Sequence, residues 1–434
     1  MREPGETTLA LLGDLLGATR RDFSIRLWDG RRLGPSPGEH ERFTLVLTHP
    51  GALRALLWPP TQLNMAEAYV RGDVDVAGDL HGVFRLADAL LVERRWSIVE
   101  RLGLARRLLS LPSERRPSAG REPARLRGRR FSRARDRNAV TYHYDTSNDF
   151  FACYLDERMV YTCAYFESPE DDLDSAQEQK LDLVCRKLRL REGERLVDIG
   201  CGWGGLVLHA AERYGVDALG ITLSEPQAEL ANERIRAAGL EDRCRVEVRD
   251  YRELDAPASF DKVVSICMFE AVGEELLPEF FARAAALLKP GGVFLNQGVA
   301  RSYHFERSAR RGPSFMERYV FPDGGIVPIS TALRAAEQAG FEVRDVESLR
   351  EHYELTLRHW VARLDERAED AIRATNEGTY RIWRLYMAGS AFGMKTGRLN
   401  VYQALFAKPD RGASGLPLTR EDLYRRVLRE PVSV

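Results

Sequence analysis

A glycine-rich turn at residues 197–205, with the sequence VDIGCGWGG, constrains the fold of this chain more than any other stretch. An apolar strand runs through Asp198 into Gly200 and Gly202, where missing side chains let the backbone turn sharply and approach a ligand closely. A helix beginning near Gly204 would point its free N–H groups and the positive end of its dipole at that ligand. The pattern predicts a nucleotide-type cofactor site, against the plainer reading of a turn that only joins strand to helix.

The positions of the acids distinguish two kinds of cofactor. The same glycines, together with Gly205, fit the G-x-G-x-x-G fingerprint of a dinucleotide site, which expects an acid at the end of the next strand to bind a ribose. Here the next strand, 217–224, ends in hydroxyl residues. The acids stand instead before the glycines, as Asp198, and at the close of the following strand, as Asp250. This order favours S-adenosylmethionine (SAM) over NAD.

Length and composition indicate a soluble protein of two domains. A chain of 434 residues is too long for one ordinary core, and 44% apolar with 30% charged residues is typical of globular proteins. No run of eighteen apolar residues occurs, and the first residues lack the apolar core of a signal peptide. We therefore expect a cytoplasmic protein. Its six cysteines form no C-x-x-C pair, so the sequence predicts reduced thiols and no metal site.

Charge is unevenly distributed although the net charge is only −1. Between residues 115 and 137 ten arginines stand against two acids, in a stretch with prolines and glycines and without helical periodicity. We interpret it as a mobile basic linker. It could meet an anionic membrane surface or simply be solvated, whereas nucleic acid is disfavoured because no recognised binding module accompanies the charges.

The pattern along the chain predicts three regions: an N-terminal domain (1–112), the basic linker (113–137) and a large α/β domain (138–434). In the first region, strands 23–28 and 43–48 with the turn Asp29-Gly30 suggest a hairpin in a small α+β domain. A helix at 95–110 could lie on a membrane or pack against the large domain. Late aromatic residues could form plain core or line an acyl-chain tunnel; they are Trp360, Tyr380, Trp383, Tyr386, Phe392 and Tyr402.

From about residue 138, strands and helices alternate. This alternation implies an α/β fold with a doubly wound parallel sheet, whose ligand lies beyond the carboxyl ends of the strands. The expected strands are 195–199, 218–222, 244–249, 260–266, 292–296 and 341–348, and the expected helices are 174–187, 204–214, 226–238, 274–288 and 333–339. A helical insertion is expected around 314–319.

Several further blocks carry a specific resemblance. They are YHYD (142–145), NDFF (148–151), YTCAYF (161–166), the VDIGCGWGG turn, GITLS (220–224), MFEAVG (268–273), YVFPDG (319–324) and HY (352–353). With them the chain resembles the cyclopropane fatty acid synthase family of SAM-dependent lipid methyltransferases over roughly residues 138–405. The first hundred residues are more loosely similar to the lipid-binding domain of bacterial members. The resemblance implies a Rossmann-like SAM-methyltransferase fold with a helical lipid-binding insertion.

The resemblance also implies a set of site residues. Members of the family transfer the sulfonium methyl of SAM to a cis double bond of an acyl chain and then lose a proton to close a cyclopropane ring. The cofactor-binding residues carried over are Tyr161, Thr162, Asp198, Gly200, Gly202, Thr222, Gln227, Asp250 and Tyr251. The family also recruits a bicarbonate ion as proton acceptor, and the matching catalytic residues here are Cys163, Glu270 and Tyr353.

One catalytic position departs from the family pattern. Where the family usually has His on the strand after Lys289-Pro-Gly-Gly, this chain has Gln297, and the residue after Glu270 is Ala271 rather than His. An amide can donate a hydrogen bond to an anion but cannot relay a proton. Bicarbonate binding could survive while deprotonation slows, so a 10-methylene acyl product remains an alternative to the cyclopropane.

The sequence therefore predicts an enzyme that methylates an unsaturated phospholipid in an anionic membrane, peripheral on the inner face. An inactive lipid-binding protein and a small-molecule methyltransferase are the alternatives. Double-bond position and head-group preference are left open, as is the oligomeric state, for which a homodimer is one option.

Overall fold

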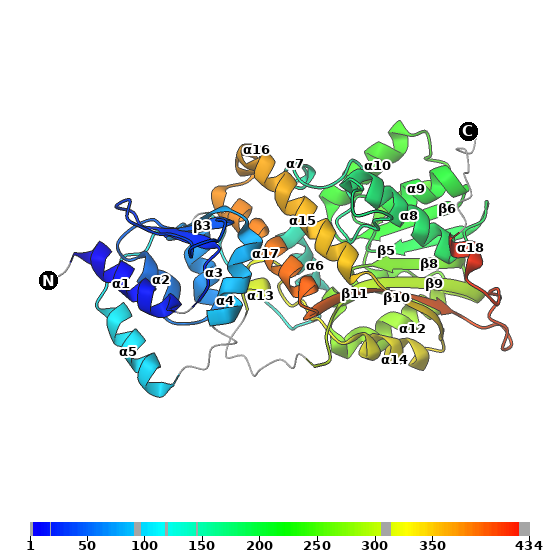
Figure 1. Cartoon of the computed structure of the whole chain (residues 1–434). Helices are drawn as coiled ribbons and strands as arrows, with labels where there is room; N and C mark the ends of the chain where they lie inside the picture. Colours follow the sequence, from blue (N-terminus) through cyan, green and yellow to red (C-terminus); the bar gives the residue numbers. More distant parts are fainter. Residues whose placement is uncertain are drawn as a thin grey trace. The chain divides into compact units, whose positions relative to one another are not determined.

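The computed structural model describes residues 3–17, 19–90, 97–117, 120–144, 146–304 and 314–424. The chain divides into two compact units (Figure 1). Unit 1 comprises the chain up to Pro123 with residues 314–320 and Ala371–Phe392. Unit 2 comprises Ala124 to residue 304, Phe321–Asp370 and the chain from Gly393.

Unit 1 is a small α+β unit around a four-stranded sheet of order β2-β1-β3-β4. The strands are β1 (Phe23–Arg26), β2 (Arg32–Leu33), β3 (Phe43–Leu47) and β4 (Val74–Gly78). The helices are α1 (Pro4–Leu16), α2 (Ala52–Leu57), α3 (Gln62–Val70), α4 (Leu80–Asp88), α5 (Ile98–Leu109), α13 (Phe315–Tyr319) and most of α17 (Glu377–Lys395).

The predicted hairpin between strands 23–28 and 43–48 is wrong. The turn at Asp29-Gly30 instead joins β1 to the two-residue β2, and β3 pairs with β1 in parallel. Because β2 occupies one edge of β1, the longer connection after β2 brings β3 to the other edge.

Unit 2 contains a seven-stranded sheet of order β10-β11-β9-β8-β5-β6-β7. Strands β9, β8, β5, β6 and β7 are parallel, whereas β11 pairs antiparallel with both neighbours. The strands are β5 (Arg195–Ile199), β6 (Asp217–Thr222), β7 (Cys244–Val248), β8 (Phe260–Ile266), β9 (Leu288–Arg301), β10 (Glu342–Ser348) and β11 (Leu399–Ala407). The predicted Rossmann-like α/β fold is confirmed.

Helices cover both faces of this sheet (Figure 1). One apolar core forms against α8 (Leu173–Leu188), α9 (Gly205–Tyr214) and α10 (Glu225–Ala237), and a second forms against α12 (Leu277–Leu287) and α14 (Ile329–Gln338). Neighbouring residues of one strand serve opposite cores: Leu196 of β5 joins the first, whereas Val197 joins the second. The near-continuous apolar strands follow from this double burial.

The remaining elements of unit 2 surround these layers. They are α6 (Arg133–Tyr144), α7 (Asn148–Ala152), α11 (Phe269–Val272), α15 (Arg350–Glu366), the start of α16 (Ala368–Ala374), α18 (Glu421–Tyr424) and the short 3₁₀ turns Tyr251–Glu253 and Glu274–Leu276. Within the described ranges, no helix has both the length and the apolar composition needed to cross a membrane.

The segment expected to be a helix-free linker contains the start of α6. Arg135 forms a double contact with Asp323, at 2.5 and 3.0 Å, and Arg252 reaches Asp136 at 2.9 Å. These ion pairs tie the first turn of the helix to the rest of unit 2. They explain why a stretch of weak helical periodicity is helical here.

Candidate active site

The predicted site residues gather where parallel strands of unit 2 end. Strands β5, β6, β7 and β8 stop at Ile199, Thr222, Val248 and Ile266, and each is followed by a loop that carries predicted residues. In an open α/β sheet the carboxyl ends of the strands meet at one edge, where ligands bind. The chain thus brings most of the residues predicted from distant segments to the same edge.

The glycine turn has the backbone that only glycine adopts freely. Gly200 has φ +88° and Gly202 has φ +55°, both in the left-handed region. A Cβ at Gly200 would lie 3.0 Å from Met268, whereas a Cβ at Gly202 would meet nothing within 4 Å. Gly202 therefore faces open space at the start of α9, which is the cradle expected for a cofactor.

Asp198 is a buried acid beside this turn. It is 3% exposed, and among the described residues its Oδ1 has no hydrogen-bond partner. Burial raises the pKa of Asp198 to about 7, although the charge of Lys180 opposes the shift. An unpartnered buried carboxylate oxygen is costly unless a ligand satisfies it, so Asp198 suits a cationic group.

The segment after α7 holds Tyr161 and Thr162 between aromatic and polar neighbours. The Tyr161 ring stacks on His143 at 5.7 Å and tilts against Trp360 at 5.1 Å. Lys180, 1% exposed on α8, donates from Nζ to Thr162 Oγ1 at 3.0 Å. Burial lowers the pKa of Lys180, while nearby acids oppose the shift.

The remaining predicted cofactor residues are held by their own partners. Thr222 donates from Oγ1 to Gln227 Oε1 at 2.7 Å, inside the core. Asp250 accepts from Arg252 at 2.6 and 2.9 Å; burial raises the pKa of Asp250, but the hydrogen bond from Arg252 outweighs it and the net shift is downward. Burial raises the pKa of Tyr251 to about 12. These contacts orient the side chains that would line a nucleoside.

Glu270 lies on α11, directly beyond β8. Its Oε1 accepts from the Val299 backbone N–H at 2.5 Å, whereas its buried Oε2 has no partner within the part of the chain that the structure describes. Burial raises the pKa of Glu270 to about 7, partly offset by Val299 and by a hydrogen bond from the Cys267 thiol. This carboxyl can therefore hold or release a proton near neutral pH.

Cys163 and Tyr353 meet at the start of α15. The Leu349 carbonyl accepts from the Cys163 thiol at 3.7 Å and from the Tyr353 backbone N–H at 3.0 Å. Burial raises the pKa of Cys163, so this thiol stays protonated at neutral pH. The Tyr353 ring packs edge-on against Trp360 at 6.0 Å, and Trp360 also contacts Tyr161.

Gln297 is fully buried on β9 and connects to Glu270 through Cys267. Its Nε2 lies 3.8 Å from Cys267 Sγ, and its Oε1 accepts from Gln403 Nε2 at 2.9 Å. Cys267 has a positive φ of 56°, and burial raises the pKa of its thiol, with a further rise from Glu270. Cys267 thus lies between Gln297, the residue that differs from the family pattern, and the predicted catalytic acid Glu270.

Lys180 and Cys267 are site residues that sequence reasoning missed. Lys180 stands with Gln177 in the buried stripe of α8, and a polar pair within an apolar stripe is a signal that could have identified it. Cys267 follows strand β8 without any motif of its own, so nothing in the pattern distinguishes it.

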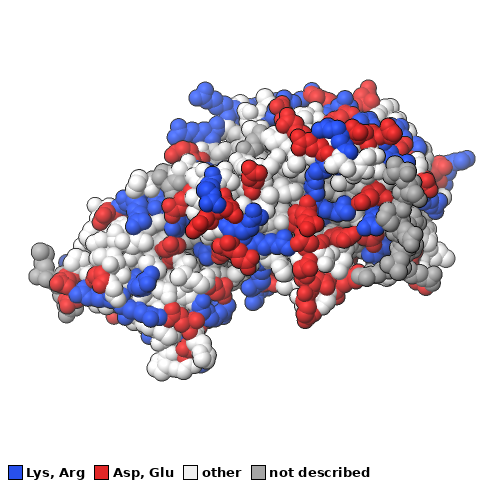
Figure 2. All heavy atoms as spheres, turned by 90° about the horizontal axis from the view of Figure 1, so that it is seen from above, with Lys and Arg blue, Asp and Glu red and all other residues white. Residues whose placement is uncertain are grey.

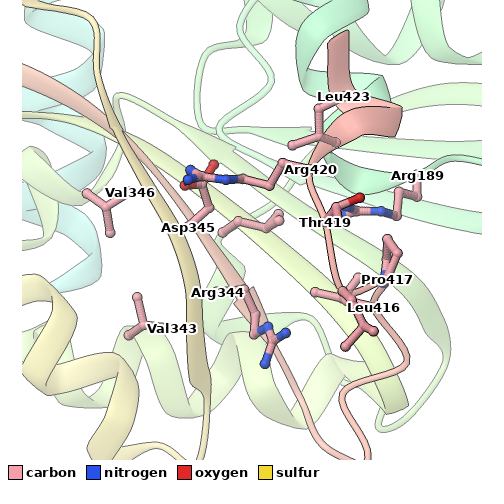
Figure 3. A pocket seen from close by; sticks show the side chains of 12 residues that line it. Arg189, Val343, Arg344, Asp345, Val346, Leu416, Pro417, Thr419, Arg420 and Leu423 are labelled. Carbon is pink, nitrogen blue, oxygen red and sulfur yellow. The ribbon is translucent and has the colours of Figure 1, made fainter. Parts of the chain in front are cut away.

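A hollow of about 410 Å³ lies elsewhere in unit 2, between β10 and the segment 416–423. Figure 3 shows Arg420 beside Asp345 there, and the two pair at 2.7 Å. None of the predicted site residues lines this hollow.

Comparison with known proteins identifies the family of this chain. Residues 131–404 match the family model described as mycolic acid cyclopropane synthetase. A probable fatty acid methyltransferase of Pseudomonas putida is 38% identical over 96% of this chain and 100% of its own length. A tuberculostearic acid methyltransferase of Mycobacterium tuberculosis is 37% identical over 63% of this chain and 65% of its own length.

Among solved structures, a mycolic acid cyclopropane synthase complexed with SAH and CTAB has a TM-score of 0.59 and 34% identity, covering 62% of this chain and 97% of that one. SAH is the demethylated form of SAM. Two features of the present site fit such a cofactor: the space at Gly202 and the unpartnered Asp198 oxygen, which suits a sulfonium or ammonium cation.

Proposed function

The chain belongs to the mycolic acid cyclopropane synthetase family and is a SAM-dependent methyltransferase, and we propose that it methylates the cis double bond of an unsaturated phospholipid acyl chain to give a cyclopropane. The observation that carries the proposal is the buried Glu270 carboxyl. Its free Oε2 lies at the same sheet edge as the glycine turn. Methyl addition to an alkene leaves a carbocation that must lose a proton, and a buried carboxyl can direct or accept that proton.

When bound, SAM supplies an electrophilic methyl group, whose addition to an alkene leaves a carbocation that must lose a proton. Asp198, Tyr161, Thr162, Gly200, Gly202, Thr222, Gln227, Asp250 and Tyr251 are the residues that would hold the cofactor. Glu270 either holds the departing proton or orients a bicarbonate ion that takes it. The rings of Trp360 and Tyr353 pack edge-on at 6.0 Å, and aromatic rings beside the cation would exclude water and stabilise positive charge.

Transfer of a radiolabelled methyl group from SAM to lipid tests the proposal. Purified protein and vesicles of a cis-unsaturated phospholipid should give labelled lipid, whereas vesicles of the saturated analogue should give none. No label in lipid would identify an inactive lipid-binding protein. Label appearing only in added small amines or alcohols would identify a small-molecule methyltransferase.

Relatives are named both for cyclopropane mycolic acids and for tuberculostearic acid. We attribute the choice between such products to Gln297. We favour ring closure and keep the methylene-branched chain as the second candidate. The buried amide next to Cys267 supports this second candidate, since it cannot accept a proton as the usual His would.

Substituting Gln297→His should raise the cyclopropane share of the product. The imidazole would add a titratable group with an ordinary pKa of about 6.5 beside Cys267. Gas chromatography of the fatty acid methyl esters reports the ratio, and the rate should acquire a pH dependence between about pH 6 and 8. Gln297→Met, similar in size but without hydrogen bonds, is the control. An unchanged product profile and pH curve would place residue 297 outside the chemistry.

A membrane surface is the proposed location of the substrate, on the inner face of the cytoplasmic membrane. On α5, Ile98, Val99 and Leu102 are 77%, 80% and 65% exposed, beside arginines of the same helix. Arg125, Arg127, Arg129 and Arg130 are also exposed. On the face drawn in Figure 2 both signs of charge are interspersed, so attraction to anionic lipid must come from such local groups.

Co-sedimentation with anionic vesicles should therefore decrease as salt shortens the Debye length from about 10 Å at 0.1 M to about 3 Å at 1 M. Reversing the four arginines at 125, 127, 129 and 130 to Glu should lower binding about 10²–10³-fold, since each contributes on the order of 1 kcal/mol. The control reverses Arg245 and Arg411, which are exposed on other parts of unit 2. Binding that responds to neither salt nor the four substitutions would leave the segment as a plain solvated connection.

A further inference from the structure

Two buried glutamines face each other across neighbouring strands of unit 2. Gln297 on β9 and Gln403 on β11 are directly opposite in the antiparallel register, and both are at most 1% exposed. Gln403 Nε2 donates to Gln297 Oε1 at 2.9 Å. Each amide has one acceptor end and one donor end, so this single bond fixes which way the two amides run relative to each other.

Lys187 fixes the direction of the pair as a whole. It is 2% exposed on α8, and its Nζ donates to Gln403 Oε1 at 2.7 Å and pairs with Glu347. An ammonium group has donors and no acceptor. Gln403 must therefore turn its carbonyl to Lys187 and its NH₂ to Gln297.

The orientation of Gln403 determines which end of the Gln297 amide faces the active site. With its Oε1 engaged by Gln403, Gln297 turns its NH₂ toward Cys267, whose thiol lowers the pKa of Glu270. Turning the Gln297 amide round would set its NH₂ against that of Gln403 and leave buried polar atoms unsatisfied. The buried hydrogen bonds thus have one favoured direction: Lys187 donates to Gln403, Gln403 donates to Gln297, and Gln297 points its NH₂ at Cys267.

We infer that Lys187 and Gln403 are positioning residues, which orient the Gln297 amide so that the active site is offered a hydrogen-bond donor and not an acceptor. The inference rests on the proposed function of this site. A donor at this position stabilises an anion, either the ionised Glu270 carboxylate or a bound anion next to it. It also means that Gln297 itself does not take the proton.

Reversing the polarity tests the inference. A carboxylate in Gln403→Glu accepts from Lys187 and demands a donor from Gln297, which must then turn its carbonyl toward the site. The expected result is a kcat about 10–100-fold lower with KM for SAM within about twofold, by analogy with losing one electrostatic stabiliser. The acid limb of the rate profile should also move to higher pH, because the Cys267 thiol would then donate to the Gln297 carbonyl and would no longer lower the pKa of Glu270.

Three further variants separate orientation from folding. Lys187→Arg keeps a donor-only side chain and should retain kcat within about threefold, whereas Lys187→Met should lose about tenfold. Glu347→Gln leaves the Lys187 donors in place, so its kcat should equal that of the wild-type protein. The titratable neighbours Cys267, Cys163 and Lys180 are the same in every variant, so they do not account for a shifted profile.

The pH dependence of Tm in the ligand-free protein provides a readout without turnover. Glu270 and Asp198 both lose a stabilising proton as the pH rises toward about 7, so each profile is compared with and without Glu270→Gln. The part of the loss that Glu270→Gln removes should move to higher pH in Gln403→Glu. If Gln403→Glu and Lys187→Met both keep the kcat of the wild-type protein and its pH dependence of Tm, the inference is overturned. The proposed function would then still stand. Wild-type protein that labels no lipid would overturn the function, and the Tm profiles would still decide the orientation.

Discussion

Glu270→Gln is expected to lower methyl transfer to lipid by about 10²–10³-fold, the scale of losing one preorganised electrostatic stabiliser. Val299 can still donate to the Gln side chain, so the fold should survive. The amide, however, can neither hold the departing proton nor carry the negative charge that favours a cation. In the wild-type protein, burial raises the pKa of Glu270 to about 7, so the rate should fall as the pH drops below about 7.

Measured kcat with vesicle substrate and measured affinity for SAM separate this effect from cofactor loss. Affinity should stay within about threefold of the parental value, since Glu270 holds no predicted cofactor contact. Glu275→Gln, an exposed acid only five residues away, is the matched control and should be silent. A Glu270→Gln protein that methylates lipid at the parental rate would remove Glu270 from the chemistry.

Asp198→Asn should weaken SAM binding by about 30-fold or more, because removing one partner of a buried charge pair costs at least about 2 kcal/mol. The same substitution should stabilise the ligand-free protein at pH 8. Burial raises the pKa of Asp198 from its ordinary 3.8 to about 7, which corresponds to on the order of 4 kcal/mol for keeping it ionised. Tm should accordingly rise by several degrees.

The pH dependence gives a second check on Asp198. Stability conferred by its raised pKa is complete below about pH 4 and is lost as the pH rises to about 7, so the gain in the Asn variant should grow over that range. SAM affinity of the wild type should rise over the same range as the carboxylate ionises. Isothermal titration and thermal melts at pH 5 to 8 measure both. Weaker binding together with a lower Tm at pH 8 would indicate a structural role instead.

The parallel part of the large sheet could be predicted because each strand and helix has a local signal. The apolar runs ending in Gly200 and Thr222 fall within a residue of the observed strand ends. Strand β11 was missed because it pairs antiparallel between β9 and β10, a contact across more than fifty residues that no local pattern encodes. The turn at Asp29-Gly30 was recognised correctly, but its partner strand was too short to detect.

The residues of the candidate site also differ in whether a local sequence signal marks them. Asp198, inside β5, and Glu270, directly beyond β8, were found because each lies in a recognisable motif at the end of a buried strand. Gln403 could not be found, since its role depends on the register that sets it opposite Gln297. Lys180 and Cys267 likewise acquire their roles only from burial in the folded chain.

The central claim is methyl transfer to an acyl-chain alkene followed by proton loss. The most direct test incubates the purified protein with cis-unsaturated phospholipid vesicles and SAM bearing a trideuterated methyl group, then separates the fatty acid methyl esters by gas chromatography with mass spectrometry. We predict an ester longer by one carbon that retains two deuterons and elutes with the cyclopropane standard. Elution with a methylene-branched standard would support the second candidate product. Esters without deuterium, or an ester that retains all three deuterons, would contradict the account.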